Sequence, residues 1–208
     1  MKTDYLKLRT KVLGIIEGMT MVDSRYFNLR RAVLFAEKVH SGTRKDGTKE
    51  FSHQLEMLAF ALNLHELLQK PYEVYLSIVL HDLYEDYPQF LEEIRRSFSD
   101  VEAYAIRLSK FKDSTEREYQ SYFDAIANCE VCSVVKAIDR YHNLSTAPGV
   151  FSNSKMLEYC DEVEMYFIPM LRVAKQLHNQ RSVYELMKSI LCTQITTIDT
   201  FLGDKTGS

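Results

Sequence analysis

The chain has 208 residues, of which 46% are hydrophobic and 26% are charged, and its formal net charge is −3 with an isoelectric point near 6.1. This is the composition of an ordinary globular protein, and its length suffices for one large domain or two small ones. The slight acidic excess argues against an extended nucleic-acid surface, but it leaves room for a local basic pocket that binds a phosphorylated small molecule.

Long segments carry apolar residues at three- and four-residue spacing, and only 7 Gly and 4 Pro interrupt them, which predicts an all-α fold. In chain order, the predicted helices span residues 4–19, 24–40, 52–69, 71–86, 88–98, 100–111, 116–128, 130–144, 154–177 and 181–202. Pro71 and Pro88 fall at or just before helix starts, where the missing N–H costs least. The main turn-rich stretches are residues 40–51 and 145–154.

Neither an internal repeat nor a linker divides the chain, so we expect one compact multi-helix domain over residues 1–203 and a disordered tail at 204–208. The first residues lack the apolar core of a signal peptide, and no window approaches the roughly 18 apolar residues of a membrane span. We therefore expect a cytoplasmic protein without a membrane partner. The oligomeric state does not follow from the sequence.

The four cysteines do not form a dense disulfide framework in a chain of this length. Cys129 and Cys132 make a lone C-x-x-C inside a predicted helix, and no second pair stands at zinc-finger spacing. We favour buried core cysteines over a zinc or redox site.

The stretch "VLHDLYED", residues 79–86, places four titratable side chains inside an apolar run: His81, Asp82, Glu85 and Asp86. Burying such groups without a partner is costly, so a cluster of this kind normally lies against a metal, a cation or a cavity. On a helix, an adjacent His and Asp can both reach one ion, and the acidic pair one turn later can act on a water molecule.

Two other places offer further ligands. His53 opens a predicted helix after the turn-rich stretch, and Asp139, Asn143 and Thr146 fall at i, i+4 and i+7 of "AIDRYHNLST". Imidazole and carboxylate ligands suit manganese, iron or zinc. Each residue alone has an ordinary structural explanation, but the order H…HD…D is harder to dismiss.

The series "HSGTRKDGT", "SH", "LHDLYED" and "AIDRYHNLST" resembles the HD-domain hydrolase half of the RelA/SpoT alarmone enzymes, over roughly residues 25–175. H…HD…D alone marks only the wide HD phosphohydrolase superfamily, whereas the R-K loop, the E-D pair and D-R-x-H-N are more restrictive. Nothing after residue 175 has the pattern of a synthetase domain, so the resemblance is to a single-domain small alarmone hydrolase with a compact all-α HD-domain architecture.

The resemblance implies a role for each matching position. One divalent ion, usually manganese in this family, would be held by His53, His81, Asp82 and Asp139. The acidic pair that orients or deprotonates the attacking water would be Glu85 and Asp86. Arg44 and Lys45 would contact substrate phosphate and base, and Asn143 and Thr146 would face the nucleoside. His142 is an alternative ligand, and His40 a helix-terminal or supporting residue.

The chain departs from the family pattern mainly around the nucleoside. Lys49, Glu50 and Phe51 replace Pro-Tyr-Ile, Gln54 replaces the Pro after the ligand histidine, and Ser145 replaces an Arg. All metal and catalytic positions match, so the sequence supports the chemistry better than the identity of the substrate. Lys49 would add a cation near the phosphates.

The main functional expectation is an enzyme of the stringent response that hydrolyses the 3′-diphosphate of guanosine tetra- or pentaphosphate (ppGpp or pppGpp), releasing pyrophosphate and GDP or GTP. A related nucleotide, such as an adenosine alarmone (ppApp) or NADPH, is the alternative within the same chemistry. From a different class, the chain would be a noncatalytic nucleotide sensor or antitoxin-like partner, against which the intact acidic pair argues.

Overall fold

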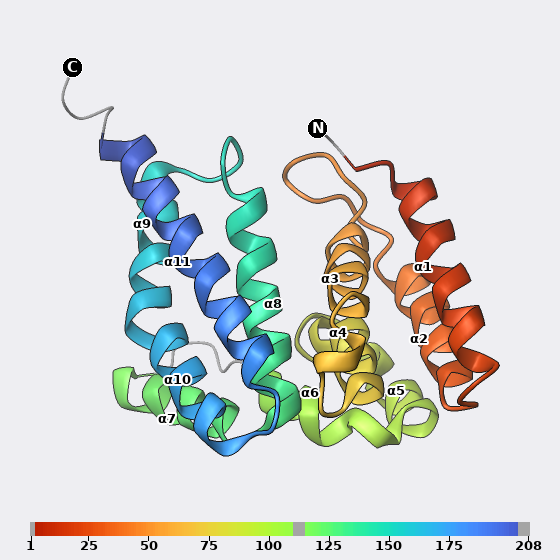
Figure 1. Cartoon of the computed structure of the whole chain (residues 1–208). Coiled ribbons are helices and arrows are strands. Elements are labelled where there is room, and N and C mark those ends of the chain that lie inside the picture. Colours follow the sequence, from red (N-terminus) through yellow and green to blue (C-terminus); the bar gives the residue numbers. More distant parts are fainter. Residues whose placement is uncertain (1–2, 110–114, 204–208) are drawn as a thin grey trace. The chain divides into compact units, whose positions relative to one another are not determined.

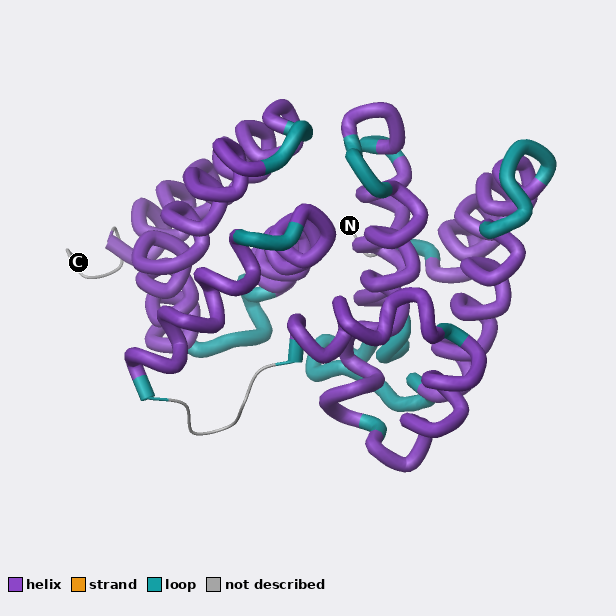
Figure 2. Tube along the Cα trace, turned by 90° about the horizontal axis from the view of Figure 1, so that it is seen from below, coloured by secondary structure: helices purple, strands orange, loops and turns teal. Residues whose placement is uncertain are grey.

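The structure is a computed structural model that describes residues 3–109 and 115–203. Throughout these ranges the chain forms helices joined by short loops, and the only strand-like feature there is an isolated bridge between Thr43 and Lys49 (Figure 1, Figure 2). The predicted all-α fold is confirmed.

The chain divides into two compact units. The N-terminal unit comprises residues 1–66 and 70–111, and the C-terminal unit comprises residues 67–69 and 112–208. The expected single domain over residues 1–203 stays a prediction, and the tail expected at 204–208 lies outside the described residues.

The N-terminal unit is built around α4. Its helices are α1 (Tyr5–Thr20), α2 (Tyr26–Val39), α3 (Ser52–Leu62), α4 (Pro71–Asp86), α5 (Leu91–Ser97) and α6 (Glu102–Leu108), with short 3-10 turns at Pro88–Phe90 and Ser99–Val101. Helix α4 packs against α2, α3 and α6. Every residue from Val74 to His81 is buried, so most of α4 lies inside the unit. Burying one Leu or Ile side chain contributes about 1.5–3 kcal/mol, so the buried residues of α4 contribute substantially to the stability of this unit.

Local sequence signals explain where α1 and α4 begin. The Asp4 carboxylate accepts a hydrogen bond from the Lys7 backbone N–H at 3.1 Å and so caps α1. Pro71 opens α4, and Tyr87 ends it with a non-helical backbone conformation. The bounds predicted for this helix, 71–86, are confirmed.

The C-terminal unit packs its helices around α8 and α11. It contains α7 (Glu116–Ala127), α8 (Glu130–Thr146), α9 (Asn153–Glu162), a π-turn at Val163–Phe167, α10 (Ile168–Leu177) and α11 (Arg181–Gly203). Helix α11 contacts α8, α9 and α10, and α7 contacts α8 and α10.

Residues 67–69 belong to this unit through a pair of glutamines. The Gln69 backbone N–H donates to Gln180 Oε1 at 3.0 Å, and the Asn179 backbone N–H donates to Gln69 Oε1 at 3.1 Å. Leu68 is buried beside them. The connection between α3 and α4 therefore supplies a turn of the C-terminal unit.

Four predicted helices differ from the structure. The helix predicted over 88–98 begins with the 3-10 turn Pro88–Phe90, and the one predicted over 100–111 ends at Leu108, with residues 110 and 111 outside the described residues. The helix predicted over 52–69 ends at Leu62 and is followed by a 3-10 turn at His65–Leu67. The helix predicted over 154–177 contains the π-turn between α9 and α10. In the described part of the chain, no helix combines the length and apolar character that crossing a bilayer requires.

Candidate metal centre

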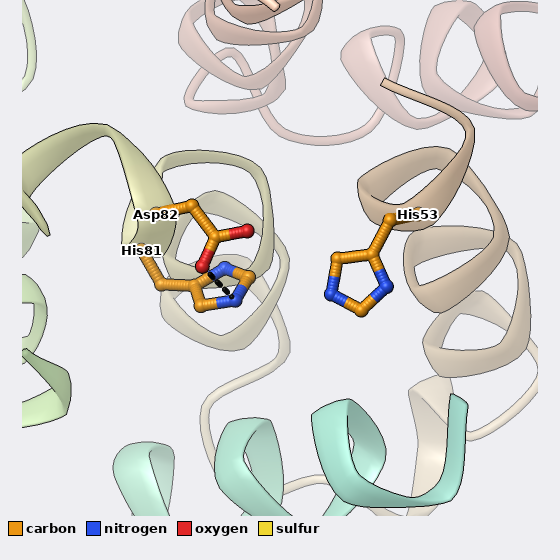
Figure 3. Close-up of side chains that lie close together, drawn as sticks. All are labelled: His53, His81 and Asp82. Atoms are coloured by element: carbon orange, nitrogen blue, oxygen red, sulfur yellow. Dashed lines mark ion pairs between the residues drawn. The ribbon is translucent and has the colours of Figure 1, made fainter. Parts of the chain in front are cut away.

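Helices α3 and α4 bring two histidines and an aspartate together. His53 lies in the first turn of α3, and His81 and Asp82 lie near the C-terminal end of α4 (Figure 3). One ligand-capable atom of each residue lies within 4.8 Å of the other two, and residues 3–109 and 115–203 contain no second such group of His, Cys, Asp or Glu. Both histidines are buried, and their ring centroids are 6.0 Å apart.

The hydrogen bonding of His81 shows which nitrogen faces Asp82. Nδ1 lies 2.9 Å from the carbonyl oxygen of Ile78. A carbonyl can only accept, so Nδ1 carries the hydrogen, and Nε2 is the nitrogen that faces Asp82: a donor in the protonated ring and a lone pair in the neutral ring. Histidines that bind metals commonly use their other N–H in this way.

Nε2 of His81 lies 2.9 Å from Asp82 Oδ1 (dashed in Figure 3). This is an ion pair when the imidazole is protonated; when the ring is neutral, both atoms are acceptors and a cation between them would be needed to compensate their repulsion. The donor set of His53, His81 and Asp82 therefore fits a divalent metal ion of the manganese, iron or zinc type.

The second oxygen of Asp82 has a different partner. Gln54 follows His53 on α3, is 2% exposed, and donates from its amide Nε2 to Asp82 Oδ2 at 2.7 Å. This hydrogen bond ties α3 to α4 beside the three candidate ligands. Sequence reasoning noted Gln54 only as a departure from the family pattern and gave it no role.

The predicted acidic pair follows the candidate ligands on α4. Glu85 and Asp86 are exposed and lie one helical turn after His81 and Asp82. Burial of part of the carboxyl, and then the negative charges of Asp82 and Glu85, raise the pKa of Asp86 above its ordinary value. A raised pKa makes Asp86 a stronger proton acceptor than an isolated aspartate.

Residues 40–51, here named the basic loop, connect α2 to α3 in a defined conformation. The Arg44 backbone N–H donates to the Thr48 carbonyl at 2.9 Å, and Asp46 Oδ1 accepts from both the backbone N–H and the hydroxyl of Thr48. Gly47 has φ 80°, a conformation that glycine adopts without strain. The loop leaves Arg44 half-buried and Lys45 exposed.

Lys49, near the C-terminal end of the basic loop, contacts an aromatic ring of α1. Its ammonium lies 4.6 Å from the ring centroid of Tyr5 on α1. The Tyr5 hydroxyl in turn donates to Glu37 Oε1 at 2.6 Å. Helix α1 thus engages the C-terminal end of the basic loop.

Glu50 joins the base of the basic loop to the end of α4. Its Oε2 accepts from the Gly42 backbone N–H at 3.1 Å, and its Oε1 accepts from the Tyr87 hydroxyl at 2.8 Å. Although burial acts in the opposite direction, these hydrogen bonds keep the pKa of Glu50 below its ordinary value. His40, the C-cap of α2, is buried beside it with Nδ1 3.5 Å from Glu50 Oε1, and burial lowers the pKa of His40.

Gly42→Ala should destabilise the protein through Glu50. A Cβ atom at position 42 would lie 2.8 Å from Glu50 Oε2 and displace the carboxylate from its hydrogen bonds. We expect the free energy of unfolding, measured by urea denaturation, to fall by about 1–2 kcal/mol. Gly14→Ala is the control, because nothing lies within 4 Å of its added Cβ in α1; it should stabilise by about 0.5–1 kcal/mol. Equal urea midpoints for Gly42→Ala and wild type would contradict the role of Glu50.

The remaining predicted site residues lie on α8 of the C-terminal unit. The Asn143 amide donates to Asp139 Oδ1 at 2.8 Å, and Lys136 Nζ lies 3.7 Å from Asp139 Oδ2. The Thr146 hydroxyl donates to the His142 carbonyl at 3.1 Å. Asp139 and Asn143 are thus joined as their spacing predicts, in a different unit from His53, His81 and Asp82.

Sequence reasoning missed the role of Arg140 within the same motif. Its guanidinium donates to Glu162 and lies 4.3 and 4.7 Å from the ring centroids of Tyr159 and Phe167. The Arg of D-R-x-H-N therefore fixes α8 to α9 and the π-turn. No sequence signal separates this contact from an exposed arginine, because it depends on tertiary packing.

The C-x-x-C motif is part of the core. Cys129 and Cys132 are both buried, as predicted, and Cys129 is the N-cap of α8, with its Sγ accepting from the Cys132 backbone N–H at 3.4 Å. The pair thus begins a helix.

No protein-family model matches the chain, and no curated protein matches it. The resemblance to the alarmone hydrolases therefore rests on the motifs quoted from the sequence.

Proposed function

We propose that this protein is a metal-dependent phosphohydrolase that removes the 3′-diphosphate of ppGpp or pppGpp, yielding pyrophosphate and GDP or GTP. The observation that carries the proposal is the convergence of His53, His81 and Asp82, with Nε2 of His81 facing Asp82. The motif series shared with the RelA/SpoT hydrolases narrows the reaction from general HD-type hydrolysis to this nucleotide class.

Four residues would hold the divalent ion, for which manganese is the expected metal. His53, His81 and Asp82 lie together in the N-terminal unit, and Asp139 is the fourth ligand that the resemblance implies. A bound divalent ion supplies Lewis acidity, which polarises a phosphoryl oxygen and makes water a better nucleophile at neutral pH.

Glu85 and Asp86 would handle the proton. Glu85 accepts a proton from the attacking water, and Asp86, whose pKa is raised, assists it. Both lie on α4, the helix that carries His81 and Asp82, so ligands and base share one rigid support.

The basic loop would bind the diphosphate. Arg44 can form a two-pronged contact with phosphate oxygens, and Lys45 adds a point charge. Asn143 and Thr146 are the residues proposed to face the nucleoside. The hydrogen bonds of Glu50 to Gly42 and Tyr87 keep the loop beside the end of α4.

The proposal is tested with purified protein, added Mn²⁺ and a panel of ppGpp, pppGpp, ppApp and NADPH. Pyrophosphate release from the guanosine nucleotides, abolished by a chelator, is the expected result. Faster turnover of ppApp, or phosphate release from NADPH, would support metal-dependent hydrolysis but would show that the substrate is a different nucleotide. Tight nucleotide binding without turnover would overturn the enzyme proposal in favour of a sensor.

Arg44→Ala should raise KM for the polyphosphorylated nucleotide roughly 10- to 100-fold, because a hydrogen bond to a charged group contributes about 1.5–3 kcal/mol. Manganese content should not change, since Arg44 is not a ligand. Lys38→Ala, which removes an exposed charge from α2, is the matched control and should keep the wild-type KM. Loss of manganese from Arg44→Ala would mean that the loop supports the metal centre instead.

A further inference from the structure

Gln54 is a buried amide whose nitrogen faces a candidate metal ligand. It follows His53 in the first turn of α3, it is 2% exposed, and its Nε2 donates to Asp82 Oδ2 at 2.7 Å. The flipped amide would place two acceptor oxygens against each other, so the donating orientation is the favourable one.

The oxygen of the Gln54 amide is less favourably placed than its nitrogen. Gln54 Oε1 is buried and has no hydrogen-bond partner among residues 3–109 and 115–203. A buried carbonyl without a partner costs about 1–3 kcal/mol. This cost offsets much of the roughly 1.5–3 kcal/mol that the hydrogen bond to the charged Asp82 contributes, so the amide adds little net stability to the fold.

The two oxygens of Asp82 have different surroundings. Oδ2 accepts from Gln54, whereas Oδ1 lies 2.9 Å from His81 Nε2, on the side of the two imidazoles. The terminal torsion of an aspartate is broad and roughly two-fold, so a carboxylate without a fixed donor samples several orientations. One strong donor on Oδ2 holds the plane of the carboxylate, with Oδ1 directed to the side of the two imidazoles.

We propose that Gln54 is a positioning residue of the metal centre, which holds Asp82 so that Oδ1 is presented together with His53 and His81. The inference rests on the metal site of the proposed function, but not on the identity of the nucleotide. Gln54 stands where the resembled family has proline, and proline has no side-chain donor. This chain therefore orients its aspartate by a contact of its own.

The test is Mn²⁺ binding by the purified protein without nucleotide, followed by the paramagnetic resonance signal of free Mn²⁺. Gln54→Leu, which keeps the approximate volume and removes the donor, should weaken Mn²⁺ binding roughly 10- to 100-fold, as losing a hydrogen bond to a metal ligand typically does. The Tm of the metal-free variant should stay close to that of the wild type, because the lost hydrogen bond to Asp82 is offset by removal of the unpartnered Oε1.

Ser52→Ala is the matched control on the same helical turn. Its hydroxyl donates to the Lys49 carbonyl and not to Asp82, so its removal should leave Mn²⁺ affinity unchanged. This variant reports on general loosening of the start of α3.

The outcomes separate the two proposals. Wild type that binds no Mn²⁺ would overturn the metal centre and the inference with it. Wild type that binds Mn²⁺, with Gln54→Leu binding it equally well, would overturn the role of Gln54 alone. A Tm of metal-free Gln54→Leu several degrees below wild type would make the residue structural and would also overturn the inference.

Discussion

Glu85→Gln should lower turnover by roughly 10²–10⁴, the usual effect of losing a general base. Glutamine keeps nearly the same volume and still forms hydrogen bonds, but it cannot accept the proton of the attacking water. The residue is exposed near the end of α4, so the fold should be unaffected. The measurement is kcat at saturating Mn²⁺, together with metal content and nucleotide affinity, both of which should stay at wild-type values.

Two further variants sharpen this experiment. Asp86→Asn should cause a similar or smaller loss, because Asp86 is assigned the assisting role. Glu93→Gln, at an exposed position on α5, removes the same charge away from the site and should leave kcat unchanged. Near-normal turnover of Glu85→Gln would remove Glu85 from the mechanism, and loss of metal from that variant would make it a ligand.

His81→Ala should abolish metal binding and activity together. The imidazole offers Nε2 to the ion while Nδ1 donates to Ile78, so alanine removes one ligand bond and leaves Asp82 without its neighbour. We expect Mn²⁺ affinity to fall by more than the roughly 10- to 100-fold cost of losing a supporting hydrogen bond. His53→Ala should behave in the same way.

Metal content and thermal unfolding measure this loss. In the wild type, Mn²⁺ at 100 times its Kd should stabilise the fold by about 2.7 kcal/mol, and the resulting rise in Tm should vanish in His81→Ala. His65→Ala is the control, since His65 bonds to Tyr75 in the same unit and belongs to no ligand group. Asp139→Ala tests whether α8 contributes a metal ligand. If this variant keeps its full metal content, all the ligands come from the N-terminal unit.

Helix positions followed from the sequence where the local signals were strong. Pro71 opens α4, and the non-helical backbone of Tyr87 ends it. The helix predicted to continue to residue 69 stops at Leu62 instead, although Leu64 and Leu68 extend its apolar spacing and are buried. Asn63 caps it by donating to the Ala59 carbonyl at 2.7 Å, and residues 67–69 belong to the C-terminal unit. Apolar periodicity indicates which residues are buried, but it does not indicate which of the two units buries them.

The π-turn in the predicted helix 154–177 has a cause that the sequence does contain. Pro169 has no N–H, so the carbonyl four residues earlier, that of Met165, lacks its helical donor. The structure accommodates this with a wider turn over Val163–Phe167, where the Ile168 N–H reaches the Val163 carbonyl. Apolar spacing alone predicts one uninterrupted helix here, and that prediction does not take Pro169 into account.

Only those residues of the candidate site that belong to the sequence motifs were predicted. His53, His81 and Asp82 were identified from residue type and order, and the structure brings them together. Gln54 and Glu50 were not, because their partners Asp82 and Tyr87 lie 28 and 37 residues away. Such contacts depend on the register between the loop, α3 and α4, which apolar spacing does not determine.

The glutamine pair that places residues 67–69 in the C-terminal unit limits how the protein can be dissected. The chain leaves the N-terminal unit after α3, contributes Leu68 and Gln69 to the other unit, and returns to form α4. A fragment that starts at residue 112 would lack Leu68 and leave Gln180 without its Gln69 contact, whereas a fragment that stops at residue 111 would expose Leu68 to water. No single cut yields two intact halves, so evolution by simple gene fusion or fission at residue 111 would have to rebuild this turn.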